Sequence, residues 1–387
     1  MRRMSRFVIM TIIILITTCI RCFAQSEFVE SGGDILTYND FDAGSIFDAV
    51  PDDIMRELPD GAEEFDAEKI AGSADPLFFI RAILDSAAKM LKPTLKFFAK
   101  MLGIVVISAA IGAVGGVTNS ESIREVAGIV TKMCLIAAMS ENILSLIDET
   151  ADYIKLVTGV GEAAVPVFSA ICIAGGNVTG ATVAANGMLI TLNFIGILTG
   201  QALFPVVRVC LALTTVAGLG AEKLGFRIEE ISKFVRKTMC FILALISATI
   251  SGVMSFQSII AARVDSLSLR AVKFAASAAV PVAGSIAADA AGTIAGSISL
   301  VKNAVGWVGI IVIILIISPI LVKLLLNKLV IVLISTISGL LEFGSAKTMI
   351  DEVSGIINFI CAVCTIASLT LIYELTVISR TMSGITV

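Results

Sequence analysis

One acidic residue, Asp289, lies in the middle of an apolar stretch of small side chains, Val280–Asn303 (VPVAGSIAADAAGTIAGSISLVKN). A carboxylate in such surroundings can bind a proton or a cation. A charged Asp at a bilayer centre costs about 2.5–3.5 kcal/mol on insertion scales, so it would persist only in a bundle interior, a watery cavity or an ion pair. The possible charge partners are Arg270, Lys273 and Lys302. The alternative is a solvated helix on the outer face, with Asp289 simply hydrated.

Two ladders of side chains form when this stretch is placed on an α-helix. The first is Gly284, Ala288, Gly292 and Gly296, and the second, beside it, is Ser285, Asp289, Thr293 and Ser297. Small residues four apart let helix backbones approach closely, and Ser or Thr hydroxyls can bond across the contact. The ladders therefore predict a face that touches protein or water and not lipid. Its role is helix packing, the lining of an aqueous cavity or pore, or ion coupling, and the residues concerned are Gly284, Ala288, Asp289, Gly292, Thr293 and Gly296.

Little else in the chain could do chemistry. Histidine is absent, which removes the Ser-His and Cys-His nucleophile pairs and nearly every catalytic zinc arrangement. Cys361 and Cys364 form a C-x-x-C pair, which we interpret as two small hydrophobic side chains on a buried helix and not as a redox motif. No Walker motif, metal-ligand spacing or nucleophile elbow occurs. We expect no catalytic, cofactor-binding or metal-binding residues, and no enzyme activity.

The composition predicts which elements position these residues. Of the 387 residues, 57% are hydrophobic and only 16% are charged, and the mean hydropathy is +0.98. Soluble domains contain about 45–50% apolar and about 25% charged residues. The apolar runs are long and continuous, whereas a β-barrel would show short alternating segments. We predict an all-α, polytopic integral membrane protein.

The N-terminus is typical of an exported protein. Residues 1–24 contain Arg2, Arg3 and Arg6, an apolar core, and a Cys-Phe-Ala sequence that ends at Ala24. This pattern predicts a signal peptide cleaved after Ala24, with an uncleaved anchor as the alternative. Residues 25–75 hold fifteen acidic and two basic residues. They predict a mostly flexible extracytoplasmic segment, with one short helix near Asp52–Leu58 and too few large apolar residues for a core.

Residues 76–100 predict a basic amphipathic helix. Its charged residues fall on one helical face, at Arg81, Asp85, Lys89, Lys92, Lys96 and Lys100. Apolar residues occupy much of the remaining surface, as in helices that lie in a membrane interface. A helix packed against a partner protein is the alternative, and Pro93 is expected to bend it.

Residues 101–387 form the predicted membrane domain. A span needs about 20 apolar residues to cross a hydrocarbon layer about 30 Å thick. Seven to nine transmembrane helices are expected from the candidate segments 101–118, 126–147, 158–178, 182–203, 204–221, 238–260, 304–322, 324–341 and 355–378.

Lys and Arg in short loops predict the cytoplasmic side. Nine spans would place three basic sites inside, namely 223–237, Lys323 with Lys328, and Arg380. The same count would place two acidic sites outside, at 148–152 and 342–352.

The block Ser266–Gly309 resembles the hallmark region of the stage III sporulation protein AE family of endospore-forming bacteria. In that family a Leu-Arg-x-x-Lys-Phe run leads to a Pro-Val-x-Gly step, an Asp, a Ser-rich helix and Lys-Asn before a span. The matching residues are Leu269-Arg270, Lys273-Phe274, Pro281-Val282, Gly284, Asp289 and Lys302-Asn303, within the small-residue block 266–303. The chain departs from the family in its acidic N-terminal segment and its many Ala and Gly residues.

The resemblance implies a sporulation protein of the mother-cell membrane that faces the engulfed forespore. It further implies membership of a multiprotein, secretion-like channel apparatus whose partners are a cytoplasmic ATPase and ring-forming membrane subunits, with no role for nucleic acid. A stand-alone secondary transporter or permease is the alternative, although no convincing internal repeat is present. An intramembrane enzyme is disfavoured because His is absent and no matched Asp pair or Ser-Lys pair lies at a plausible depth.

Overall fold

The computed structural model describes residues 43–66, 69–70, 76–117, 121–174, 178–218, 228–279, 283–340 and 344–381. Within the helices, the longest stretch without described side chains is 257–303. The predicted signal peptide, 1–24, and the first part of the acidic segment lie outside the described residues.

The described chain is mostly helical and contains no strand, so the predicted all-α class is confirmed. Two short helices precede the bundle, α2 (Ser45–Asp48) and α3 (Asp52–Met55). The long helices are α5 (Pro76–Val117), α6 (Glu121–Ala174), α7 (Val178–Ile197), α8 (Phe204–Gly218), α9 (Ile228–Ala279), α10 (Ala283–Leu340) and α11 (Gly344–Thr381). A π-helical segment, η2 (Leu198–Leu203), joins α7 to α8.

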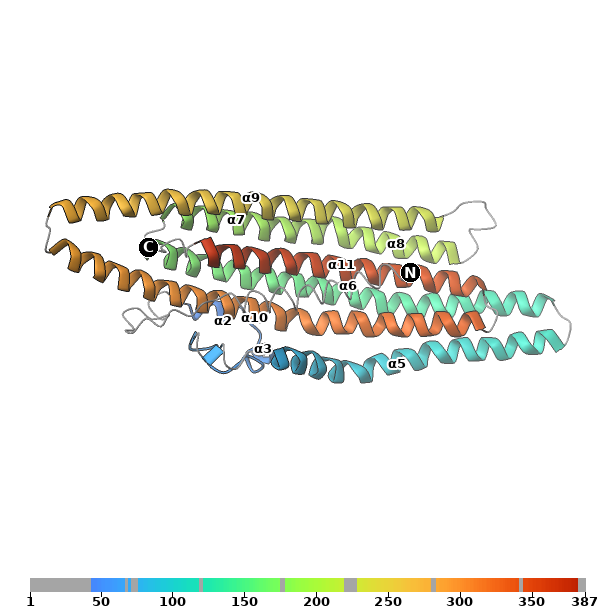
Figure 1. Cartoon of the computed structure of the whole chain (residues 1–387). Helices are drawn as coiled ribbons and strands as arrows, with labels where there is room; N and C mark the ends of the chain where they lie inside the picture. The colour runs from blue at the N-terminus through green and yellow to red at the C-terminus, as the bar shows by residue number, and fades with distance from the viewer. Residues whose placement is uncertain are drawn as a thin grey trace.

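These helices form antiparallel rods that lie along the long axis of the molecule (Figure 1). Helices α7 and α8, with η2 between them, make one rod, and each other long helix makes its own. Helix α10 contains 58 residues, so at a rise of about 1.5 Å per residue it extends about 87 Å. The hydrocarbon core of a bilayer is about 30 Å thick. The rods are therefore much longer than a membrane crossing requires.

Within the described residues, six helical stretches are long and apolar enough to cross a membrane, so the expected count of seven to nine spans is not confirmed. The difference arises because three predicted pairs of spans are continuous. Segments 126–147 and 158–178 merge in α6, 182–203 and 204–221 in the α7–α8 rod, and 304–322 and 324–341 in α10.

Prolines do not end these helices. Pro93, Pro166 and Pro319 lie inside α5, α6 and α10. In a packed membrane bundle, neighbouring helices and local adjustments satisfy the backbone groups that a proline leaves free. Each of these three helices therefore continues through its proline.

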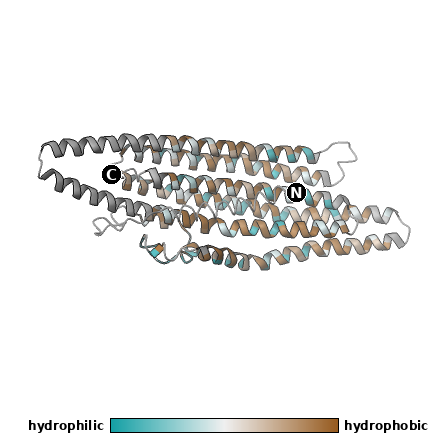
Figure 2. Ribbon diagram, in the orientation of Figure 1, coloured by the Kyte–Doolittle hydropathy of each residue, from teal (hydrophilic) through white to brown (hydrophobic). Residues whose placement is uncertain are grey.

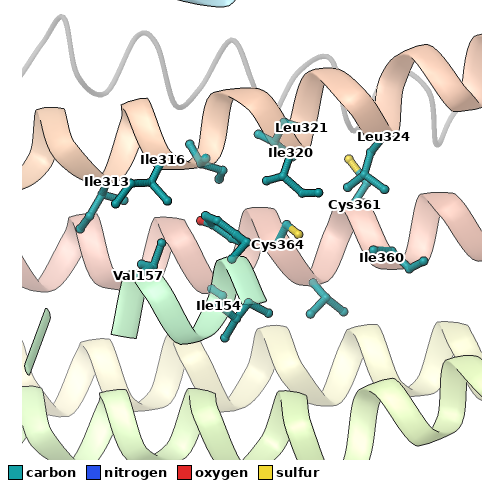
Figure 3. Close-up of a cluster of buried hydrophobic side chains, with 14 of the residues drawn as sticks. Ile154, Val157, Ile313, Ile316, Ile320, Leu321, Leu324, Ile360, Cys361 and Cys364 are labelled. Atoms are coloured by element: carbon teal, nitrogen blue, oxygen red, sulfur yellow. The ribbon is translucent and has the colours of Figure 1, made fainter. Parts of the chain in front are cut away.

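Helices α10 and α11 are the most deeply buried of the rods. In their most apolar 18-residue stretches, 83% of residues in α10 and 72% in α11 are buried, against 22% in α5 and 17% in α9. Figure 3 shows part of this core, in which Ile313 and Ile320 of α10, Ile154 of α6 and the two cysteines of α11 are among the buried side chains. Cys361 and Cys364 are free and buried, as the hydrophobic interpretation predicted.

The acidic segment is more ordered than the sequence suggested. The expected short helix is present as α3, and Ile46, Ile54 and Phe65 are almost fully buried. The rings of Phe47 and Phe65 are 5.1 Å apart, and α2 contacts α6 while α3 contacts α10. Residues 43–66 thus obtain a core by packing on the bundle, which a count of their own apolar residues could not reveal.

We expect Phe168→Ala to lower the free energy of unfolding by about 3–5 kcal/mol, because a buried ring leaves a cavity. Phe168 is 2% exposed on α6, whereas Phe241 on α9 is 67% exposed. The matched control Phe241→Ala should change the free energy of unfolding by less than about 0.5 kcal/mol. Equilibrium unfolding in mixed detergent micelles measures both. Equal losses would contradict the placement of α6 in the core and of α9 at the surface.

Candidate functional site

The small-residue face predicted from the sequence lies on one continuous helix. Residues Gly284 to Gly296 all fall within α10, and Arg270 and Lys273 fall within α9. The helical placement is therefore confirmed. Figure 1 shows this part of α9 and α10 as an antiparallel hairpin that extends beyond the neighbouring rods at one end of the bundle. The side chains lie outside the described residues, so packing, pore lining and ion coupling stay predictions.

Helix geometry separates the three possible partners of Asp289. Lys302 follows Asp289 by thirteen residues on α10, which is about 20 Å along the axis and beyond the reach of an ion pair. Lys273 and Arg270 lie on the preceding helix, α9. Their side chains, like that of Asp289, are outside the described residues, so both stay predicted partners.

A second set of polar residues joins the rods to one another, and we call it the polar belt. It consists of the contacts Lys100–Glu141, Asn142–Asn327, Asp148–Arg208, Glu149–Lys323, Arg236–Glu352 and Lys233–Glu352. On α6 its members occupy positions 141 to 149, a length of about 12 Å. The belt links α6 to α5, α8 and α10, and links α9 to α11.

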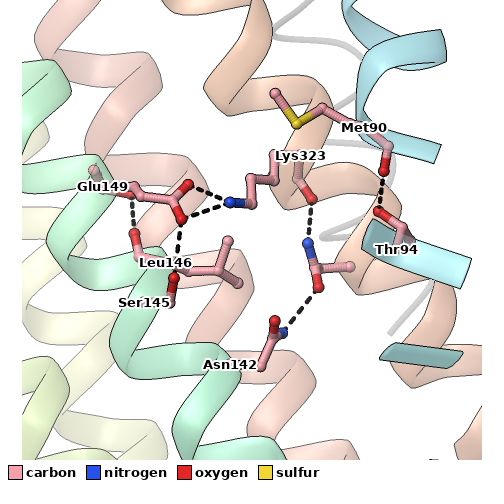
Figure 4. Close-up of polar contacts among 9 residues, drawn as sticks. Met90, Thr94, Asn142, Ser145, Leu146, Glu149 and Lys323 are labelled. Atoms are coloured by element: carbon pink, nitrogen blue, oxygen red, sulfur yellow. Dashed lines mark hydrogen bonds and ion pairs between the residues drawn. The ribbon is translucent and has the colours of Figure 1, made fainter. Parts of the chain in front are cut away.

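The contact between α6 and α10 is the most extensive part of the belt (Figure 4). Lys323 Nζ lies 2.5 Å from both carboxylate oxygens of Glu149, and Ser145 Oγ donates to Glu149 at 2.9 Å. Asn142 Nδ2 donates to Asn327 Oδ1 at 2.9 Å. Asn327 in turn donates to the Lys323 carbonyl oxygen at 2.8 Å. These contacts fix the register of α6 against α10.

The most buried charges of the belt join α9 to α11. The side chains of Arg236 and Glu352 are 8% and 4% exposed, with Nη2 and Oε2 3.0 Å apart. Lys233 Nζ lies 2.6 Å from Glu352 Oε1, and Arg236 Nη1 donates to Ser232 Oγ at 2.5 Å. A Cβ on Gly355 would lie 2.9 Å from Arg236 Nη2, so glycine provides room for the guanidinium against α11. Both charges are compensated, as burial of charge requires.

The belt overturns the predicted membrane orientation. That prediction placed Lys323 and residues 223–237 inside, and placed the acids near Glu149 and Glu352 outside. The structure pairs Glu149 with Lys323, and Glu352 with Lys233 and Arg236. Groups in ion-pair contact cannot lie on opposite sides of a bilayer. The count of basic residues in loops gave the wrong orientation because these charged residues lie on helices. There they form ion pairs with residues of neighbouring helices.

One buried acid was missed by the sequence reasoning. Glu374 on α11 is 2% exposed and contacts Thr191 of α7. It is the single acidic residue between position 353 and the C-terminus. An isolated acid in such an apolar segment was the sequence signal that could have identified it. Glu141, by contrast, pairs with Lys100 at the surface, where both side chains are more than half exposed.

Long apolar helices joined by polar contacts define a polytopic α-helical membrane protein. The chain belongs to the stage III sporulation protein AE family, because the profile of that family matches residues 53–381. It is 24% identical over 332 residues to the stage III sporulation protein AE of Bacillus subtilis (strain 168), with 84% of this chain and 82% of that protein covered. No solved structure matches. The resemblance carried by residues 266–309 is thereby confirmed.

We expect Glu352→Gln to destabilise the protein by about 3–5 kcal/mol, because it leaves the buried Arg236 guanidinium without its counter-charge. The control is Asp152→Asn, which removes an exposed ion pair with Lys155, both side chains being at least 75% exposed. Exposed pairs of this kind contribute little, so the control should leave the unfolding transition unchanged. Unfolding in mixed micelles measures both variants. A stable Glu352→Gln protein would show that the belt does not hold α9 to α11.

Proposed function

We propose that this chain is an integral membrane component of a multiprotein apparatus that connects the mother cell to the forespore during endospore formation. Family membership supports the role in sporulation, and the long apolar helices of the described chain support residence in a membrane. In this proposal the chain scaffolds or lines a passage and performs no catalysis. A cytoplasmic ATPase and ring-forming membrane subunits are its proposed partners. In this proposal the chain resides in the mother-cell membrane, and residues 25–75 lie on the extracytoplasmic side of that membrane.

The main observation that supports a role in an assembly is the length of the exposed apolar surface along the α7–α8 rod. Along the α7–α8 rod, Val178, Ile197 and Val216 are 55%, 55% and 52% exposed. Thirty-eight residues separate the first from the last, a distance of about 57 Å. A bilayer covers about 30 Å. Figure 2 shows hydrophobic residues along most of the described length of the bundle. Apolar surface beyond the bilayer requires a protein partner.

The acidic segment supports the same conclusion. Residues 43–66 pack on α6 and α10 and carry exposed acids, including Asp48, Asp52 and Asp53. Glu57 forms an ion pair with Lys89 of α5 at 2.7 Å, where the lysine side chain is 64% exposed. Exposed charges of this density do not belong in hydrocarbon. Part of the bundle beside them therefore lies outside the bilayer, which favours a component of an assembly over a permease that acts alone.

A clean in-frame deletion tests the proposed role. We expect engulfed forespores to stop developing, so that the deletion strain forms almost no heat-resistant spores. A wild-type copy at a second locus should restore them, which excludes effects on neighbouring genes. Normal spores from the deletion would refute the proposal. Solute movement by the purified protein in liposomes, lost in Asp289→Asn, would instead favour the permease.

A further inference from the structure

Glu374 is a buried carboxyl group at the contact between α11 and α7. Thr191 Oγ1 lies 2.5 Å from Glu374 Oε1, and the exposed fractions of the two residues are 0% for Thr191 and 2% for Glu374. The second carboxyl oxygen, Oε2, is buried and has no hydrogen-bond partner among the described residues. The group therefore has one hydroxyl contact and a free oxygen, which is an unusual state for a buried acid.

Close helix packing encloses this site on two sides. A Cβ on Gly161 of α6 would lie 2.6 Å from Leu192, the residue after Thr191. A Cβ on Gly309 of α10 would lie 3.3 Å from Leu375, the residue after Glu374. Two glycines thus let α6 approach α7, and α10 approach α11, at the level of the carboxyl group. The residue before Glu374, Tyr373, forms a hydrogen bond with Ser255 of α9, with the two hydroxyl oxygens 2.6 Å apart.

No described cation neutralises Glu374. Helix α7 contains no charged residue, α9 has none from 238 to 262, and α10 has none from 304 to 322. On α6 the acid nearest this level, Glu162, is exposed. On α11 itself the nearest charged residues are Glu352 and Arg380, which are about 33 Å and about 9 Å away along the axis. No ion pair of Glu374 occurs within the part of the chain that the structure describes.

We propose that Glu374 and Thr191 form a proton-binding site in the core of the bundle, with the carboxyl group protonated at neutral pH. A buried carboxylate without a counter-charge neutralises instead of remaining ionised. Uptake converts the carboxylate and a solvent proton into the neutral acid, and release returns the proton to water. A sodium ion fits less well, because the described oxygen donors here are the two carboxyl oxygens and one hydroxyl, whereas hard cations take six or more.

Infrared spectroscopy of the full chain in lipid nanodiscs tests this site. The carbonyl stretch of a protonated carboxyl group is resolved from that of a carboxylate. We expect one such band at neutral pH that is lost in Glu374→Gln and retained in Glu162→Gln, the matched control at an exposed acid. Transfer to deuterated buffer should shift the band, because the bound proton exchanges with solvent.

A second variant keeps the test decisive if Glu374→Gln fails to fold. Thr191→Val removes the hydroxyl that contacts the carboxyl group, so it should shift the same band to higher frequency without abolishing it. The absence of the band from folded wild-type protein would overturn the proposal, as would its persistence in Glu374→Gln or its loss when sodium replaces potassium. None of these outcomes depends on a role in sporulation, so the proton site and the proposed function can fail separately.

Discussion

The thickness of a bilayer limits how much of this bundle lipid can cover. Hydrocarbon extends about 30 Å, yet α6, α9 and α10 contain 54, 52 and 58 residues, or about 78–87 Å of helix. Each rod must therefore leave the membrane without ending as a helix. Backbone hydrogen bonds continue through the boundary, so what changes along a rod is the surroundings of its side chains. A rod that is longer than the bilayer can therefore carry proline residues and the charged residues of the polar belt along its length.

The polar belt shows how charges are accommodated on such rods. Glu149 with Lys323, and Glu352 with Arg236, place opposite charges on different helices at the same height. A buried pair contributes little net stability compared with apolar side chains of the same size, but removal of one partner is costly. We infer that these pairs set the register of α6 against α10 and of α9 against α11. The two pairs therefore limit the sliding of α10 along α6 and of α11 along α9.

Sequence reasoning reached the class of protein and the helical nature of residues 283–303, because hydropathy and small-residue spacing are local signals. It also placed Cys361 and Cys364 in a buried helix, and the block 266–309 pointed to the family. It failed where the answer depends on contacts between distant residues. Asp148 and Glu149 looked like a loop because their partners, Arg208 and Lys323, lie far along the chain. Segment 43–66 looked too polar to fold because its core is completed by the bundle. The surroundings of Asp289 stay a prediction, because its side chain lies outside the described residues.

Depth measurement along the α7–α8 rod tests most directly whether the apolar surface is longer than the bilayer. Spin labels at Val178, Ile190, Ile197, Val209 and Val216, all exposed positions, would report lipid or water contact for the purified chain in nanodiscs. We expect lipid contact over about 20 consecutive residues and water contact at the remaining labelled positions, where a partner would dock in the cell. Lipid contact at every position from 178 to 216 would contradict the assembly role, because no apolar surface would then be left for a protein partner.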